Sequence, residues 1–164
     1  MTDEKMLYLV RHAKSGWMDS CQRDFDRILD EQGNRDAAEM GHRLQQNGIR
    51  PDLVICSPAC RAVQTLEHLA PCMNIPIVDV LYNKSIYEAA TSTLLEIIQK
   101  LDDPVDSAMM IGHNPAMSWL INHLTSEHIS NMPTCSIATI SIPSNHWKDA
   151  GTASSRLLDF DFPE

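Results

Sequence analysis

The residues best suited to chemistry in this chain are an arginine and a histidine at the end of its first apolar run. The run covers residues 6–10, and Arg11 and His12 follow it directly, with Lys14 and Ser15 just beyond. A cation is costly to bury at the edge of a core unless an anion accompanies it. The order of these residues therefore predicts a site that receives an anion, with an imidazole placed to act on it.

Three further candidates, Arg61, His113 and Glu88, each lie in a segment that follows a later apolar run. Ligands of open α/β sheets bind outside the carboxyl ends of the strands. We therefore expect these three side chains to meet Arg11 and His12 at one rim of a sheet. The rim would carry two guanidiniums, two imidazoles and a carboxyl group.

This combination of residue types suits phosphoryl transfer. Two guanidiniums match phosphate oxygens in a bidentate way, and a helix that begins after Ser57 adds backbone N–H donors. A neutral imidazole is a competent nucleophile, and a second one can donate to the charge that builds on the phosphoryl group. A carboxylic acid near the leaving group can protonate it. The chemistry needs no cofactor or metal, and we find no residue set in the sequence that suggests a metal site.

Taken singly, most of these residues also have an ordinary structural explanation. A lone histidine is often structural, and an exposed glutamate is common. Arg61 differs, because a cation in the first turn of a helix opposes the helix dipole unless an anion is bound there. The remaining histidines are expected on helices or loops away from strand ends, and we interpret them as non-catalytic: His42, His68, His123, His128 and His146.

Length and charge restrict the class of protein. A chain of 164 residues is predicted to form one domain over residues 1–164. The net charge of −9 argues against nucleic acid or an anionic membrane as a partner. No stretch approaches the ~20 apolar residues of a membrane span. We expect the partner to be a phosphorylated protein or a small phosphorylated metabolite, attracted by a local cluster of cations.

The cysteines and the first residues bear on the cellular compartment. The five cysteines show neither a disulfide framework nor zinc-ligand spacing, so we expect reduced thiols in a cytoplasmic protein. They are Cys21, Cys56, Cys60, Cys72 and Cys135. The opening residues lack the basic region of a secretory signal, so none is predicted.

Strand-like apolar runs alternate with helical patterns along the chain. This order predicts an α/β fold, a three-layer α/β/α arrangement with a mostly parallel central sheet of about six strands. Ser57-Pro58 and Asn114-Pro115 each predict a helix start, with a capping residue before proline at the first helical position. Strands are expected at residues 6–10, 53–56, 75–80, 108–111, 136–142 and 157–160, and helices at 31–47, 58–70, 92–101 and 115–124.

Three sequence motifs resemble those of the histidine phosphatase superfamily, which has the phosphoglycerate-mutase-like fold. They are L-V-R-H-A at 9–13, S-P-A-C-R-A-V-Q-T at 57–65 and G-H-N-P at 112–115. Within the superfamily the chain looks most like the short, SixA-type phosphohistidine phosphatases, on R-H-A-K-S at 11–15, D-F-D-R at 24–27, Y-E-A at 87–89 and M-P-T at 132–134.

The resemblance implies that His12 is the phosphorylated nucleophile and that Arg11, Arg61 and His113 form the phosphate pocket. We add Ser15 as a candidate substrate contact and Glu88 as a candidate general acid, although the best-known SixA proteins lack a matching glutamate. Ala13 replaces the usual glycine of the superfamily, as is common in the short group. Met18 stands where mutase-type members tend to carry asparagine.

The leading hypothesis is a metal-independent phosphatase that works through a phosphohistidine intermediate on His12. One alternative is a mutase-like phosphotransferase, which must exclude water and for which the short chain leaves little room for a lid. Another is a non-catalytic module that binds a phosphorylated ligand, and a third is a flavodoxin-like nucleotide binder, for which no glycine-rich loop is found. The substrate stays open between phosphohistidine on a protein, a small phosphomonoester and a sugar phosphate.

Overall fold

A mixed sheet of six strands forms the centre of the fold. The computed structural model describes residues 3–17 and 22–164. The strand order is β3-β2-β4-β1-β5-β6, with β1, β2, β3 and β4 parallel and β5 antiparallel to both of its neighbours. The strands are β1 (Lys5–Arg11), β2 (Leu53–Cys56), β3 (Leu81–Tyr82), β4 (Ser107–Gly112), β5 (Ile137–Ile142) and β6 (Arg156–Asp161).

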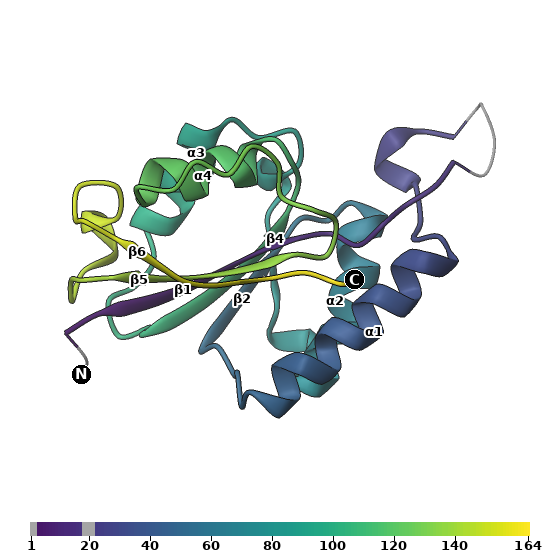
Figure 1. Cartoon of the computed structure of the whole chain (residues 1–164), viewed down its shortest axis with the longest axis horizontal. Coiled ribbons are helices and arrows are strands. Elements are labelled where there is room, and N and C mark those ends of the chain that lie inside the picture. The colour runs from purple at the N-terminus through teal and green to yellow at the C-terminus, as the bar shows by residue number, and fades with distance from the viewer. Residues whose placement is uncertain (1–2, 18–21) are drawn as a thin grey trace.

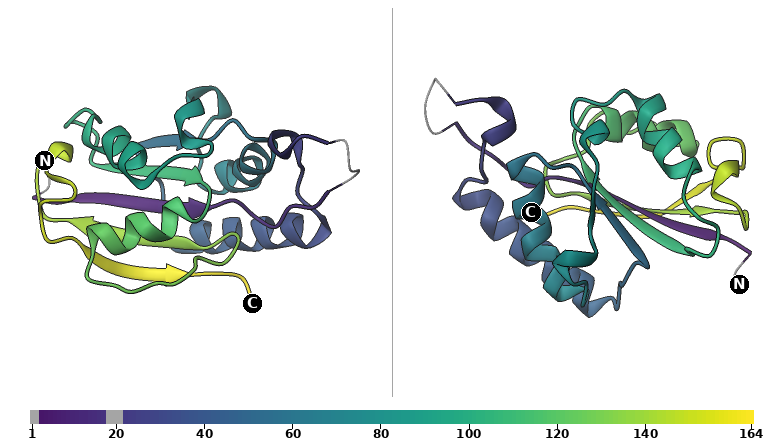
Figure 2. Two further views of the ribbon diagram at one scale, coloured as in Figure 1. Left: turned by 90° about the horizontal axis from the view of Figure 1, so that it is seen from above. Right: turned by 180° about the vertical axis from the view of Figure 1, so that it is seen from behind.

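Two pairs of helices cover the two faces of this sheet (Figures 1 and 2). On one face lie α1 (Glu31–Gln46) and α2 (Cys60–Cys72), and on the other α3 (Thr91–Gln99) and α4 (Ala116–Leu124). Leu7 and Leu9 of β1 belong to the core under α3 and α4, whereas Val10 belongs to the core under α1 and α2. This alternation is the two-residue period of a strand buried on both faces. The predicted three-layer α/β/α fold with a mostly parallel sheet is confirmed.

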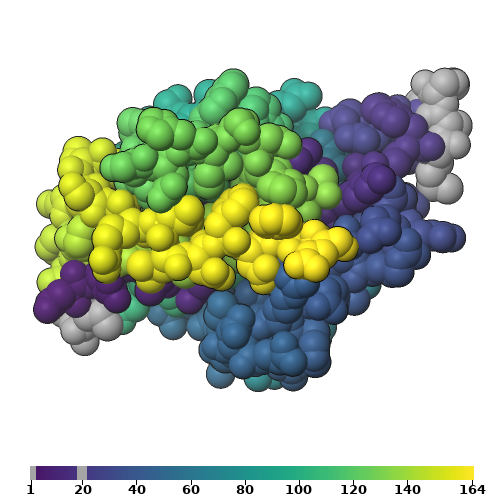
Figure 3. Space-filling view, viewed as in Figure 1, coloured from purple at the N-terminus to yellow at the C-terminus, as the bar shows by residue number. Residues whose placement is uncertain are grey.

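The antiparallel edge of the sheet is partly open to solvent. β6 is the edge strand next to β5, and Leu158 on it is exposed. In the space-filling view β6 crosses the molecular surface between α4 and the helices of the opposite face (Figure 3). Its weak apolar pattern in the sequence reflects this position.

The strand predicted at residues 75–80 is wrong. The backbone N–H of Ile75 closes the end of α2 by donating to the carbonyl of Ala70, and Pro76 has no N–H to give to a sheet. A 3₁₀ turn follows at Ile77–Asp79, where Val78 is 90% exposed. The strand that pairs with β2 on the side away from β4 is instead the two-residue strand β3.

Both predicted helix starts are wrong by one or two residues. The N–H of Ser57 continues the sheet by donating to the carbonyl of Ile111, so Ala59 becomes the N-cap and α2 begins at Cys60. The N-cap of α4 is Pro115, and the Asn114 side chain instead accepts a hydrogen bond from the N–H of Ser118. Before α2 the extended chain runs past the expected cap, whereas before α4 residues 114–115 form a turn in which Pro115 already has helical backbone angles.

The structure also bears on the expectations for the cysteines and for membrane-spanning helices. Cys56, Cys60, Cys72 and Cys135 are free thiols, as predicted. Cys21 and Met18 lie outside the described residues. Within residues 3–17 and 22–164, no helix combines the length and the apolar character needed to cross a membrane.

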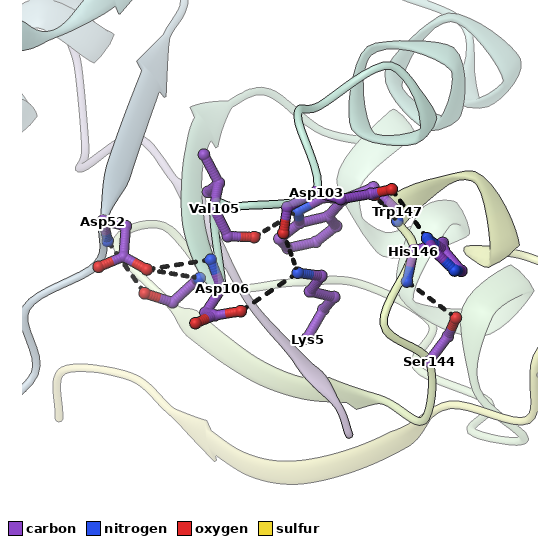
Figure 4. A network of polar contacts seen from close by, with 9 residues as sticks. Lys5, Asp52, Asp103, Val105, Asp106, Ser144, His146 and Trp147 are labelled. Carbon is purple, nitrogen blue, oxygen red and sulfur yellow. Dashed lines mark hydrogen bonds and ion pairs between the residues drawn. The ribbon is translucent and has the colours of Figure 1, made fainter. Parts of the chain in front are cut away.

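A buried lysine ties together the amino end of the sheet (Figure 4). Lys5 is fully buried in β1; its ammonium donates to the carboxylate of Asp106 at 3.2 Å and to the carbonyl of Asp103. The ring of Trp147 lies 5.8 Å from the same ammonium, and its indole N–H donates to Val105 at 2.7 Å. This network joins β1 to the loop before β4 and to the turn after β5.

Replacing Lys5 should therefore destabilise the fold without touching the carboxyl end of the sheet. Lys5→Ala removes the buried side chain and its hydrogen bonds, and we expect the free energy of unfolding to fall by about 2–3 kcal/mol. Lys5→Met keeps the volume and should lose about 1 kcal/mol. Urea denaturation measures both, with the exposed Lys148→Ala as the control. A Lys5→Ala variant as stable as that control would contradict the assignment.

Candidate active site

The sheet brings the ends of β1, β2 and β4 to one rim. Arg11 pairs with Gly112 in the parallel register of β1 and β4, and Cys56 of β2 pairs with Ile111. The residues that follow these strands, including His12 and His113, therefore start from neighbouring positions. The 3₁₀ turn at Asp24–Asp26 lies beyond the same end of β1 (Figure 1).

The backbone around His12 is held from several sides. Its N–H donates to Gly112, and its carbonyl accepts from Cys135. The N–H of Ala13 donates to the hydroxyl of Thr65 on α2 at 2.9 Å. Each of these groups is a backbone donor or acceptor that would be costly to leave unpaired inside the protein. The short segment after β1 is therefore fixed in place before any ligand arrives.

The start of α1 packs against the segment that follows β1. Asp30 caps α1 by accepting from the N–H of Gly33, and its own N–H donates to the carbonyl of Lys14. A Cβ built on Gly33 would lie 2.0 Å from that carbonyl oxygen, so only glycine fits. The helix cap and the close approach together fix where the chain leaves the rim.

The His12 ring has one defined tautomer. Its Nδ1 lies 2.7 Å from the carbonyl oxygen of Ala13, and its Nε2 lies 3.3 Å from Nε of Arg61. A carbonyl can only accept and a guanidinium can only donate, so Nδ1 carries the hydrogen and Nε2 carries the lone pair. Burial lowers the pKa of His12 to about 3; the hydrogen bond to Ala13 opposes this shift, and the charges of Arg61 and Arg11 add to it. The ring is neutral at pH 7.

Arg61 is shared between His12 and a carboxylate. Its two terminal nitrogens donate to the backbone and side-chain oxygens of Asp24 at 2.7 and 2.9 Å. The hydroxyl of Tyr87 donates to the same carboxylate at 2.7 Å, and Arg27 donates to its other oxygen at 3.0 Å. Burial alone would raise the pKa of Asp24, but the hydrogen bonds from Tyr87 and Arg61 outweigh it and lower the pKa to about 2.

His113 packs between His12 and Tyr87. Its ring centroid lies 5.2 Å from that of His12 and 5.6 Å from that of Tyr87. Its Nε2 lies 2.7 Å from the hydroxyl of Ser57. Burial, with Arg61 nearby, lowers the pKa of His113 to about 4. This second imidazole is therefore also neutral at pH 7.

Arg11 is the last residue of β1, and its side chain contacts the segment before β5. One terminal nitrogen donates to the carbonyl of Met132 at 2.7 Å, while its Nε is buried without a partner among the described residues. Burial, followed by the charge of Arg61, lowers the pKa of Arg11. The unpaired Nε of Arg11, with the guanidinium of Arg61 nearby, makes this part of the rim favourable for an anion.

The structure places the two remaining candidates differently. Glu88 is exposed, follows Tyr87 directly, and has a left-handed backbone with φ of +56°. Ser15 pairs with Leu29 in an isolated antiparallel bridge, and no hydrogen bond among the described residues joins it to the other candidates. Arg11, His12, Arg61 and His113 are thus brought together, and Glu88 lies at the edge of the group.

Three residues near the centre were not among the predicted site residues. Asp24 and Tyr87 belong to sequence motifs without being predicted site residues, and Ser57 is predicted only as a helix cap. The alternating pattern of strands and helices gives no signal for Asp24, because its contact with Arg61 spans 37 residues of sequence. Tyr87 could have been found, because it precedes the candidate Glu88. Within the described residues, no three histidine, cysteine, aspartate or glutamate side chains are grouped so that they could hold a metal ion.

Comparisons with known proteins agree with this architecture. The model of the histidine phosphatase superfamily (branch 1) matches residues 7–81. An uncharacterized protein of Mycobacterium tuberculosis is 35% identical over 94% of this chain and 99% of its own length. The structure of a putative phosphohistidine phosphatase SixA from Agrobacterium tumefaciens is 31% identical, with a TM-score of 0.84 over 97% of this chain and 98% of that one.

A more distant structure shares the fold. It is the protein histidine phosphatase SixA complexed with tungstate, which is 22% identical, with a TM-score of 0.81 over 96% of this chain and 97% of that one. With the strand-end arrangement of Arg11, His12, Arg61 and His113, these findings lead to one conclusion. The chain belongs to the histidine phosphatase superfamily, in its SixA-type group.

Proposed function

We propose that this protein is a metal-independent phosphatase that forms a phosphohistidine intermediate on His12. The observation that carries the proposal is the tautomer of the ring, because Nδ1–H is held by Ala13 and the lone pair of Nε2 faces Arg61. A nucleophile needs an available lone pair at the pH of the reaction, and burial keeps this imidazole neutral.

The proposed reaction has two displacements at phosphorus. In the first, Nε2 of His12 attacks, the bond to the leaving group breaks, and the phosphoryl group moves to the imidazole. In the second, water attacks phosphorus, the Nε2–P bond breaks, and inorganic phosphate leaves. Arg11, Arg61 and His113 donate to the phosphoryl oxygens, whose charge they stabilise most strongly in the transition state.

Arg61 must exchange partners during this cycle. Its nitrogens donate to Asp24 and to Nε2 of His12 in the free protein. Once phosphorus occupies Nε2, that nitrogen has no lone pair left, so the Nε–H of Arg61 turns to a phosphoryl oxygen. The ligand-free contacts thus keep the guanidinium within reach of the group that it binds.

Solvent access favours hydrolysis over the mutase alternative. The side chain of Asp24, in contact with Arg61, is 40% exposed, and Glu88 is exposed at the same edge. A mutase must keep water from the phosphorylated histidine. The defined tautomer of His12 also argues against a module that only binds a phosphorylated ligand, because binding needs donors and not an imidazole lone pair.

We propose a phosphohistidine protein or a small phosphomonoester as substrate. The first choice is supported by the 31% identity to the Agrobacterium protein named as a putative phosphohistidine phosphatase. The proposed leaving-group acid is Glu88, because Asp24 is held ionised by its cationic neighbours. A left-handed backbone at a non-glycine residue is strained, and such strain concentrates at functional sites.

Covalent catalysis is tested by trapping the intermediate. His12→Ala should abolish turnover of aryl phosphates and of phosphohistidine peptides, because no other lone pair replaces Nε2. Rapid quenching followed by intact-mass analysis should show an acid-labile phosphoryl adduct on the wild-type protein and none on the variant. His42→Ala, at an exposed position on α1, is the control and should keep full activity. Appreciable turnover by His12→Ala would refute the proposal.

The role of Glu88 is tested with different leaving groups. An alkoxide needs a proton as it leaves, whereas an activated phenolate needs little help, so Glu88→Gln should slow alkyl phosphates at least ~100-fold and nitrophenyl phosphate only slightly. Steady-state kcat/KM values on both substrates measure this, with Glu96→Gln on α3 as the control. An equal loss on both substrates would indicate positioning instead, and no loss would make Glu88 a surface residue.

The two buried imidazoles should make stability fall in acid. Their pKa values are about 3 and about 4 in the folded protein, below that of an unfolded histidine, so the unfolded chain binds more protons between these values and ~6.5. Stability should fall by roughly 1 kcal/mol per pH unit for each ring as the pH drops from 6 to 4.5. Denaturation of wild type, His12→Gln and the control His42→Gln measures this. A wild-type slope in His12→Gln would contradict it.

A further inference from the structure

We propose that Ser57 is a positioning residue that fixes His113 with its hydrogen on Nδ1, so that Nδ1 is the atom that donates to the phosphoryl group. The phosphoryl contact rests on the proposed function. The tautomer itself can be measured without any turnover. The pair lies at the rim formed by β2 and β4, where Ser57 Oγ and His113 Nε2 are 2.7 Å apart.

The hydroxyl of Ser57 has two hydrogen-bond contacts among the described residues. Ser57 is fully buried, and its backbone N–H is held by the carbonyl of Ile111. The backbone N–H of Ala59, the N-cap of α2, lies 3.3 Å from the hydroxyl oxygen. An N–H can only donate, so Ala59 occupies one lone pair of this oxygen.

The remaining proton of the hydroxyl decides the direction of the bond to His113. A buried hydroxyl hydrogen is costly to leave without an acceptor. Of the two groups that contact this hydroxyl among the described residues, Nε2 of His113 is the one that can accept a hydrogen bond. Ser57 therefore donates and Nε2 accepts, which places the hydrogen of the neutral ring on Nδ1. In the opposite tautomer, Nε2–H of His113 would donate to the hydroxyl oxygen, and the hydroxyl hydrogen would be left without an acceptor.

The other ring nitrogen lacks a hydrogen-bond partner within the described part of the chain. Nδ1 of His113 is buried and has no hydrogen-bond partner among the described residues. Its ring lies 5.2 Å from that of His12, measured between centroids. An N–H without an acceptor beside a nucleophile and two guanidiniums matches the anionic oxygen of a phosphoryl group. The two imidazoles then present unlike atoms to one substrate, a lone pair from His12 and a hydrogen from His113.

Nitrogen-15 NMR of histidine-labelled protein measures the tautomer directly. Long-range ¹H–¹⁵N spectra of the wild type at pH 7, assigned by comparison with His113→Gln, should show Nδ1 of His113 protonated and Nε2 bare. Inorganic phosphate should then shift the Nδ1 signal. In Ser57→Ala the ring should become a mixture of tautomers. A wild-type ring protonated on Nε2, or an unchanged tautomer in Ser57→Ala, would overturn the proposal.

Kinetics separate this role from a merely structural one. Ser57→Ala should lower kcat about tenfold, the size of one neutral hydrogen bond, with a smaller change in KM. Ser57→Thr restores the hydroxyl and should recover both the tautomer and part of the rate. The control is Ser141→Ala, a buried serine of β5 whose hydroxyl bonds Glu4, and it should leave the rate and the His113 spectrum unchanged.

The two proposals fail in different ways. If His12→Ala retains turnover but the His113 ring of the wild type carries its hydrogen on Nδ1, covalent catalysis is refuted and the role of Ser57 in setting the tautomer of His113 stands. If His12→Ala is inactive but the His113 spectrum is the same in wild type and Ser57→Ala, the proposed function stands and the role of Ser57 is overturned.

Discussion

The hydrogen bond from Nδ1 of His12 to the carbonyl of Ala13 decides what the rest of the site can do. It leaves the lone pair on Nε2, and it requires the carbonyl of Ala13 to be held next to the ring. The hydroxyl of Thr65 accepts from the N–H of Ala13, while the carbonyl of Gly112 and the N–H of Cys135 hold the backbone of the preceding His12. Contacts from α2, β4 and the loop before β5 together fix the orientation of the His12 ring.

A second constraint is electrostatic. An acidic protein with a net charge of −9 places two guanidiniums and two imidazoles at one rim. Burial keeps both imidazoles neutral, so the excess positive charge comes from Arg11 and Arg61. The carboxylate of Asp24 compensates Arg61 in the free protein. The local field therefore attracts an anion although the whole molecule repels one.

The sequence was most informative where burial is continuous. The parallel strands β1, β2 and β4 have largely apolar centres, and the sequence predicts that the residues after them share a rim because parallel strands end at the same edge. The strand prediction at 75–80 is wrong, because an apolar run alone does not reveal that Pro76 and the end of α2 remove its sheet hydrogen bonds. The residues that contact the site are harder to predict from the sequence. Asp24 reaches Arg61 through the fold of a long segment, and the bond of Ser57 to His113 depends on the start of α2 shifting beyond Pro58.

The carboxylate of Asp24 on Arg61 also bears on how a reaction ends. Under the proposed mechanism, the last species in the pocket is free inorganic phosphate, which competes with Asp24 for the same guanidinium nitrogens. As a tethered anion, Asp24 is always present at high local concentration. Its return to Arg61 offsets part of the affinity for phosphate, so the pocket empties more easily than two unopposed arginines would allow. Inorganic phosphate in the surroundings would then inhibit the protein less.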